Sequence, residues 1–257
     1  MNNYTSGFMA SSAFGGEDSN TIAYKKSTGK TPGLIWCGGL KSDMDGTKAN
    51  ALHQWSDQLG RAFVRFDYFG HGLSSGAFRK GTISRWATDT VQVIDELTKG
   101  PQIIIGSSMG GWTALLATLA RPQRIKALVL LAPAPDFTEK LMWAGFSNEI
   151  RKTIMEDGIY YEPSDYEEPY EISRDLILDG RNNLLLDSAI NIKVPVRIIH
   201  GMRDSSVPWR HGQKLMDALV SPDVELNLIK NADHNLSSPA DIAHLQNVIA
   251  KVINLLE

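Results

Sequence analysis

Short apolar runs alternate with amphipathic segments along most of this chain of 257 residues. The runs are rich in β-branched residues and apolar on both faces, which is typical of parallel strands covered by helices on each side. The segments between them carry their apolar residues on one helical stripe. This alternation predicts an α/β fold with a mostly parallel central sheet, helices on both faces and right-handed crossovers. The expected strands are 62–68, 102–107, 125–133, 194–201 and 224–230, and the expected helices are 82–97, 110–120 and 239–256.

The first forty residues are expected to be mainly extended. Residues 6–14 and 20–28 flank the polar turn 15–20, which predicts an opening β-hairpin. A short apolar run, 33–39, follows and closes in two glycines.

The stretch 136–191 breaks the alternation, because it shows no clear strand. It is acidic: between Glu149 and Asp179 the chain has ten acidic residues and three basic ones. An excursion between two core strands is a candidate lid over a site at the strand ends. The predicted organisation is a core of residues 1–135 and 192–257 with an inserted lid of residues 136–191.

The segment "IIIGSSMGGW" places a G-x-S-x-G pattern between an apolar strand and an amphipathic helix. A strand that turns at once into a helix strains the residue at the turn and brings the residues two before and two after it close together. Ser108 has glycines at both positions, whereas its neighbour Ser107 would have an isoleucine and a methionine. Ser108 is therefore the predicted nucleophile, and the alternative is an ordinary turn with a serine N-cap.

A serine hydroxyl needs a base to take its proton, and the base needs an acid to orient it. In elbow enzymes these groups follow the serine in the order acid, then histidine. His234 fits the base, because it follows the expected strand 224–230 at another carboxyl strand end. Asp204 follows the strand before that and is the predicted acid. Asp136, after the strand 125–133, is the alternative acid.

Acyl transfer also needs donors for the oxyanion that develops on the substrate carbonyl. The backbone N–H of Met109, at the start of the expected helix, is one predicted donor. The loop after 33–39 is expected to supply the second from Leu40, or alternatively from Gly39, because its glycines let the backbone come close to the elbow.

Composition disfavours several other classes of protein. A formal net charge of −3 and a sequence pI near 6.1 indicate no basic surface for nucleic acid. The one cysteine, Cys37, cannot form an intrachain disulfide or a cysteine-rich zinc site. The first residues lack a signal-peptide pattern and the longest apolar run is too short to span a bilayer, so a cytoplasmic protein with no membrane span is expected.

The residues singled out above resemble the α/β-hydrolase superfamily across nearly the whole chain outside residues 136–190. Within it, the chain is most similar to the group of mitochondrial palmitoyl-protein thioesterases, also described as acyl-glucuronide esterases. The stretches that carry the likeness are "MDGTKA", "RFDYFG", "GPQIIIGSSMGGW", "LARPQ", "HGMRDSSVPW" and "ADHNL". The resemblance implies Ser108, Asp204 and His234 as a catalytic triad, and no metal or organic cofactor. The chain departs from the group in the lid, which sets the acyl pocket.

The predicted function is a serine hydrolase that cleaves carboxylic esters or thioesters through an acyl-enzyme on Ser108. The alternatives are a serine peptidase and a non-catalytic ligand-binding domain on the same fold. The expected partner is a small acyl ester or thioester, held in a lid pocket whose wall includes Trp143, Met142 and Phe146. These three belong to an apolar set spaced as one helical face, Leu141, Met142, Trp143, Phe146, Ile150 and Ile154, while Glu162, Asp165, Glu167 and Glu168 are expected to face solvent.

Overall fold

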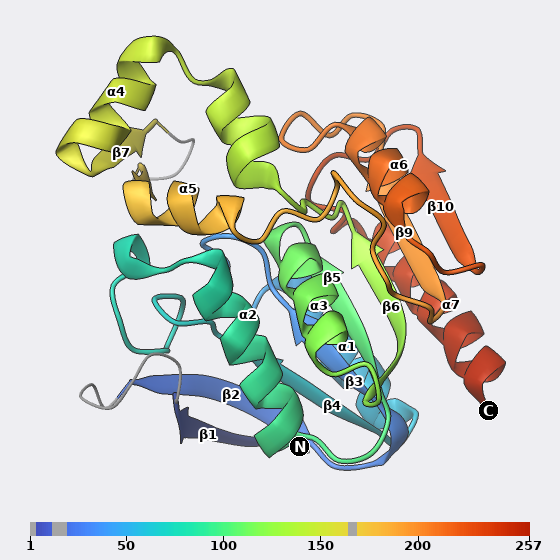
Figure 1. Cartoon of the computed structure of the whole chain (residues 1–257). Coiled ribbons are helices and arrows are strands. Elements are labelled where there is room, and N and C mark those ends of the chain that lie inside the picture. Colours follow the sequence, from blue (N-terminus) through green and yellow to red (C-terminus); the bar gives the residue numbers. More distant parts are fainter. Residues whose placement is uncertain (1–3, 12–19, 164–168) are drawn as a thin grey trace.

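The centre of the molecule is an eight-stranded sheet in the order β1-β2-β4-β3-β5-β6-β9-β10 (Figure 1). The computed structural model describes residues 4–11, 20–163 and 169–257. The antiparallel pairs are β1 (Thr5–Ala10) with β2 (Thr21–Ser27), and β2 with β4 (Arg61–Phe66). The strands that pair only in parallel are β3 (Lys30–Cys37), β5 (Gln102–Ser107), β6 (Ile125–Leu131), β9 (Val196–Gly201) and β10 (Val224–Ile229). The predicted fold class is confirmed, and so is the opening hairpin, whose turn lies mostly outside the described residues.

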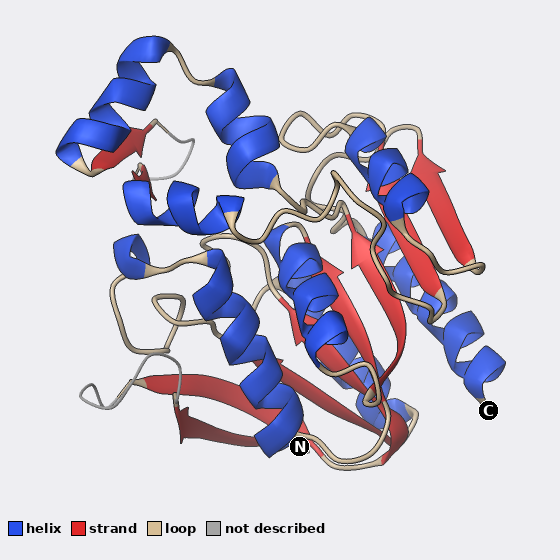
Figure 2. Cartoon of the chain, in the orientation of Figure 1, coloured by secondary structure: helices blue, strands red, loops and turns tan. Residues whose placement is uncertain are grey.

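Helices cover both faces of the sheet (Figures 1 and 2). One face carries α2 (Ile83–Gln92), α3 (Met109–Ala120) and α6 (Trp209–Ala218), and the other carries α1 (Thr47–Gln58) and α7 (Pro239–Leu256). A π-helical turn, η2 (Val93–Leu97), continues α2, and a short 3-10 turn, η1 (Phe78–Lys80), precedes it. None of the described helices combines the length and apolarity needed to cross a membrane.

Two apolar layers explain why the central strands are apolar on both faces. Ile104 of β5 packs in one layer with Trp86 and Trp112 from α2 and α3. Ile103, its neighbour on β5, packs in the other layer with residues of α1 and α7. Successive side chains of a strand point to opposite faces, so a strand that is covered on both sides needs apolar residues throughout.

The segment after β6 contains a hairpin that the sequence pattern did not predict. β7 (Ile159–Glu162) and β8 (Tyr170–Ser173) pair antiparallel, so the expectation of no strand within 136–191 is wrong. Each strand has only four residues, too few for an alternating pattern to stand out. In Figure 1 this segment lies beyond the carboxyl ends of the central strands.

The helical part of the same segment also differs from the prediction of a single helical face. It consists of a π-helix, η3 (Thr138–Trp143), followed by α4 (Asn148–Asp157), and α5 (Arg174–Arg181) follows the hairpin. Ser147 is the N-cap of α4, because its hydroxyl accepts the N–H of Ile150 at 3.3 Å. The apolar residues expected on one helix are therefore divided among η3, the bend that contains Phe146, and α4.

Candidate active site

Ser108 lies at a sharp turn between β5 and α3, with a backbone φ of 55° and ψ of −120°. A positive φ is costly for a residue with a side chain and is typical of functional sites. A Cβ on Gly106 would strike the carbonyl of Gly110, and a Cβ on Gly110 would strike that of Cys37. Close packing therefore requires both glycines. Ser107 is buried, while Ser108 is half-buried beneath a cavity.

Ser108, His234 and Asp204 form one hydrogen-bonded chain, although they lie on three separate loops. His234 Nε2 is 3.0 Å from Ser108 Oγ, and His234 Nδ1 is 2.7 Å from Asp204 Oδ2. Because an ionised carboxylate only accepts hydrogen bonds, Nδ1 carries the ring proton and Nε2 is left to accept from the serine hydroxyl. This is the arrangement in which a histidine can take a proton from a serine nucleophile.

Asp204 is buried and hydrogen-bonded at both oxygens. Oδ1 accepts the backbone N–H of Ser206 at 2.9 Å and that of Val207 at 2.7 Å. Oδ2, which bonds His234, also lies 3.3 Å from His200 Nε2. Burial raises the pKa of Asp204, but the hydrogen bonds from the two histidines and the Val207 amide outweigh it and hold the pKa well below its usual range. The carboxyl is therefore ionised at neutral pH and able to orient the base.

Asp136, the alternative acid, has other partners. It is fully buried, and its carboxylate accepts the N–H of Leu185 at 2.8 Å and that of Leu186 at 2.9 Å. Burial raises the pKa of Asp136, and these two amide bonds oppose the rise. The geometry thus brings Asp204 against His234 and uses Asp136 to hold the returning end of the inserted segment.

The loop after β3 lies against the elbow and the first turn of α3, because a Cβ on Gly110 would strike the carbonyls of Cys37 and Gly38. Gly39, Leu40 and Met109 all line the cavity above Ser108. Gly39 lies next to the elbow, since a Cβ built there would lie 3.5 Å from Ser108 Cβ. The residues proposed from sequence as amide donors therefore surround the nucleophile.

A cavity of about 1210 Å³ lies over Ser108. One wall comes from the core loops and the N-terminal end of α1, and the other comes from the inserted segment. That second wall is largely apolar, with Leu141, Met142 and Phe146 among its side chains. Two of the three residues expected from sequence in a substrate wall, Met142 and Phe146, thus line the cavity.

Trp143, the third, is not among the side chains that line this cavity. The guanidinium groups of Arg181 and Arg151 lie 4.7 and 5.5 Å from the centre of its ring. Trp143 also packs against the apolar cluster that contains Phe146, within the inserted segment. Trp143 therefore lies beside the cavity wall and does not line the cavity.

Glu162 is a second correction. It was expected to face solvent, but it is half-buried on β7 and lines the cavity, where burial raises its pKa. The other acidic residues of that expectation, Asp165, Glu167 and Glu168, lie outside the described residues.

Three of the remaining histidines have contacts of a structural kind. His53 bonds Ser27 on the α1 face, His211 bonds the Pro135 carbonyl, and His200 donates to the Val207 carbonyl. Across the described ranges of the chain, no group of three or more histidine, cysteine or acidic side chains is placed to hold a metal ion.

Sequence reasoning missed the residues that hold the loop after β3. The carboxylate of Asp67 accepts the N–H of Met44 at 2.6 Å, and His71 Nε2 accepts the N–H of Lys41 at 3.1 Å. Both side chains belong to the stretch "RFDYFGHG" after β4, but nothing in its pattern indicates which backbone groups they bind.

An elbow serine, a histidine and a buried acid at the carboxyl ends of a mostly parallel sheet define an α/β-hydrolase. A family model described as serine aminopeptidase, S33, matches residues 39–175. The mitochondrial palmitoyl-protein thioesterase ABHD10 of Bos taurus is 41% identical over 241 residues, which are 93% of this chain and 78% of that protein. Its Homo sapiens counterpart is 39% identical over the same shares. The chain therefore belongs to the α/β-hydrolase family, and it is a hydrolase.

Solved structures agree with this membership. The alpha/beta hydrolase domain-containing protein 10 from mouse has a TM-score of 0.90 at 37% identity, over 98% of this chain and all of that one. A putative hydrolase from Agrobacterium vitis S4 has a TM-score of 0.93 at 38% identity, over 97% of this chain and 99% of that one. The similarity extends over the inserted segment as well as the core.

Proposed function

We propose that this hydrolase cleaves carboxylic esters or thioesters through an acyl-enzyme on Ser108. The observation that carries the proposal is the hydrogen-bonded chain from Asp204 through His234 to Ser108, at the floor of a cavity with one apolar wall. The family relatives named palmitoyl-protein thioesterase support the choice of ester and thioester bonds.

The reaction divides into two half-reactions that use the same groups. Ser108 Oγ attacks the acyl carbonyl and gives its proton to His234 Nε2, which passes it to the departing alcohol or thiol. Water then gives a proton to His234 and attacks the acyl-enzyme, and the carboxylic acid leaves as Ser108 regains its proton. Asp204 holds the ring in the required tautomer and stabilises the imidazolium that forms in each half.

The oxyanion of each tetrahedral intermediate needs donors that are already in place. The N–H of Met109 begins α3, where the helix dipole favours negative charge. The N–H of Leu40 is the second proposed donor, with Gly39 as its alternative.

Residues 136–191 serve in this proposal as a lid that holds the acyl chain. Leu141, Met142 and Phe146 present apolar side chains to the cavity that contains Ser108. Each methylene that enters such a pocket gains about 0.8 kcal/mol, so the pocket favours apolar acyl chains over polar ones.

The proposal is tested by labelling with a fluorophosphonate and locating the label by peptide mass spectrometry. One label per chain on Ser108 is expected, together with turnover of p-nitrophenyl esters and of thioesters with the same acyl groups. A folded chain that takes no label and turns over neither series would instead be a binding domain on this fold.

The description of the matching family model gives a second candidate, an aminopeptidase. Aminoacyl p-nitroanilides, run beside the esters at equal concentration, decide between the two. We expect the esters and thioesters to be the faster substrates. A higher kcat/KM for the anilides would assign the chain to the peptidases.

A further inference from the structure

His71 lies in the loop after β4, buried beneath the cavity and packed among aromatic rings. It is 4% exposed, and its ring centre lies 5.2 Å from those of Phe78 and Trp86 and 5.7 Å from that of Tyr68. These contacts fix the plane of the imidazole. His71 also lines the cavity above Ser108.

Both ring nitrogens of His71 are engaged, each with a different loop. Nε2 lies 3.1 Å from the backbone N of Lys41, and Nδ1 lies 3.1 Å from the carbonyl oxygen of Phe69. A backbone N–H can only donate and a carbonyl can only accept, so Nε2 is the acceptor and Nδ1 carries the proton. His71 is therefore a neutral imidazole that joins the loop after β4 to the loop after β3.

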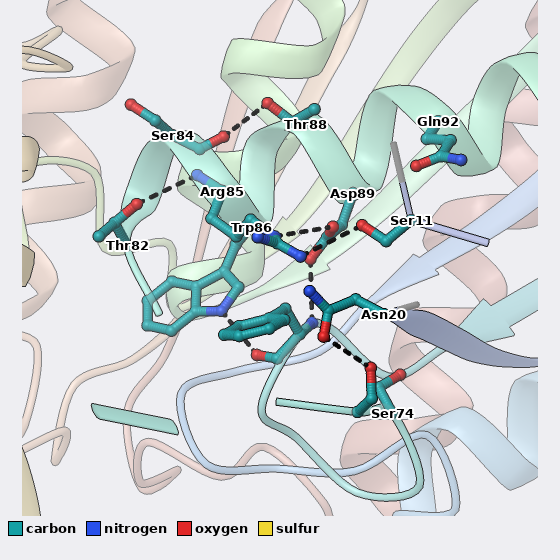
Figure 3. Close-up of polar contacts among 12 residues, drawn as sticks. Ser11, Asn20, Ser74, Thr82, Ser84, Arg85, Trp86, Thr88, Asp89 and Gln92 are labelled. Carbon is teal, nitrogen blue, oxygen red and sulfur yellow. Dashed lines mark hydrogen bonds and ion pairs between the residues drawn. The ribbon is translucent and has the colours of Figure 1, made fainter. Parts of the chain in front are cut away.

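The Phe69 end of this link is anchored to α2. The backbone N–H of Phe69 donates to Asp89 at 2.9 Å, and its carbonyl accepts the indole N–H of Trp86 at 3.0 Å. Figure 3 shows Arg85, Trp86 and Asp89 gathered on one side of that helix. The Arg85 guanidinium lies 4.0 Å from the centre of the Phe69 ring. The Phe69 carbonyl, which accepts the hydrogen bond from His71, is thus held by α2.

The Lys41 end lies next to the residue proposed to donate to the oxyanion. Lys41 has a φ of 56°, a conformation that a residue with a side chain adopts only when its surroundings hold it there. Its N–H belongs to the peptide between Leu40 and Lys41, which directly follows the peptide that carries the Leu40 N–H, so the bond to His71 holds the backbone next to the proposed donor. Its ammonium also donates to the Pro169 carbonyl at 3.0 Å, which connects the same loop to the inserted segment.

We infer that His71 is a positioning residue for the proposed hydrolysis, which holds the loop after β3 through Lys41 so that the Leu40 amide faces the oxyanion. The inference rests on the proposed function. It assigns His71 a role in transition-state stabilisation and none in proton transfer, because both of its nitrogens are already used within the protein.

Three substitutions separate the two hydrogen bonds. His71→Gln can keep an acceptor where Nε2 lies, His71→Asn can keep only a donor where Nδ1 lies, and His71→Leu keeps neither. His53→Leu is the matched control, since His53 is equally buried on the opposite face of the sheet and contacts Ser27. Melting temperatures report any general loss of packing in all four variants.

We expect His71→Leu and His71→Asn to lower kcat by roughly 10- to 100-fold with little change in KM, because a displaced oxyanion donor is missed mainly in the transition state. Affinity for a boronate transition-state analogue should fall by the same factor. His71→Gln should recover most of both losses, and His53→Leu should change neither. Fluorophosphonate should still label Ser108 completely, though more slowly. Hydrogen exchange of the Lys41 amide should speed up in the Leu and Asn variants only.

The inference is overturned if the Gln and Asn variants lose kcat equally, or if analogue affinity stays constant while kcat falls. The Gln and Asn comparison decides alone if His71→Leu is insoluble. An unmutated chain that takes no label and cleaves no ester would overturn the proposed function and this inference together. If the unmutated chain is labelled and active, and the His71 variants match it in kcat and in analogue affinity, this inference alone is overturned.

Discussion

The carboxylate of Asp136 accepts the backbone N–H of Leu186 at 2.9 Å, and that of Leu185 at 2.8 Å. Asp136 begins the excursion that follows β6, while the two leucines end it, so one buried side chain joins the start of the inserted segment to its return. An acid that looks equivalent to Asp204 in the sequence therefore has a different task.

The two acids should respond differently to the same substitution. Asp204→Asn should slow turnover by a factor on the order of a thousand or more, because an amide favours the wrong tautomer of His234. Asp136→Asn should change turnover by less than about tenfold but lower stability by roughly 1–3 kcal/mol, because one buried N–H loses its acceptor. Steady-state kinetics and urea unfolding of both variants check this. A larger loss of kcat in Asp136→Asn would reassign the triad acid.

The elbow makes an equally specific prediction about adjacent serines. Ser108→Ala should abolish turnover and covalent labelling, whereas Ser107→Ala should leave the label in place, because only Ser108 occupies the strained turn between Gly106 and Gly110. Intact-protein mass spectrometry after fluorophosphonate treatment measures both. Label recovered on a peptide of the Ser108→Ala variant would show that another side chain is the nucleophile.

The site residues that lie directly at strand ends could be predicted from the sequence. Ser108, Asp204 and His234 each follow a strand, and parallel strands bring their carboxyl ends to one edge of the sheet. The order of the motifs then suggested their pairing, and the geometry agrees. The α/β fold was predictable for the same reason, since the central strands and flanking helices have strong periodic patterns.

The inserted segment was less predictable, because its elements are short and irregular. Phe146 lies in the bend between two helices, and the four-residue strand β7 places Glu162 at the cavity. The task of His71 was not predictable either. Its two hydrogen bonds join loops that only the assembled sheet brings together, and a lone histidine in a loop carries no pattern.

Acid should destabilise the fold partly through His71. Burial lowers the pKa of His71 to about 4; the positive charge of Lys41 adds to this effect, and the hydrogen bond to the Phe69 carbonyl opposes it. The ordinary pKa of a histidine, which applies in the unfolded chain, is 6.5. Between these values the unfolded chain binds the extra proton, so this contribution to stability is complete above pH 6.5 and is lost as the pH falls toward 4. The loss should reach about 2 kcal/mol at pH 5.

Other groups also titrate between pH 4 and pH 6.5, so the pH dependence of stability has to be compared between the unmutated chain and a His71 variant. Asp89 acts in the opposite sense, because burial raises its pKa to about 6 and the folded state then holds the additional proton. Urea unfolding of the unmutated chain and of His71→Gln, each at pH 7 and pH 5, isolates the His71 share. The variant should lose less stability between the two pH values, and an equal loss would contradict the assignment of a neutral, buried imidazole.

The cavity wall predicts how activity depends on acyl length. For the unmutated enzyme, kcat/KM should rise by up to about fourfold for each added methylene that finds the pocket, and the rise should stop once the pocket is full. Phe146→Ala should flatten this rise without changing the rate on an acetyl ester, because it removes an apolar side chain from the wall and leaves the elbow intact. Trp143→Ala is the control, since that ring packs under Arg181 and Arg151 instead of lining the cavity.

Phe146 also packs in a small apolar cluster with Ile154 and Ile172, so its truncation has a structural cost. Phe146→Leu keeps most of that packing and should give an intermediate slope, which separates loss of the wall from loss of fold. Kinetics on a p-nitrophenyl series from acetyl upward would measure all three variants. A slope that falls in Trp143→Ala and not in Phe146→Ala would place the acyl chain on the other side of η3. A flat series in the unmutated enzyme would mean that the inserted segment holds no acyl chain, and the apolar wall would then have to receive the leaving group.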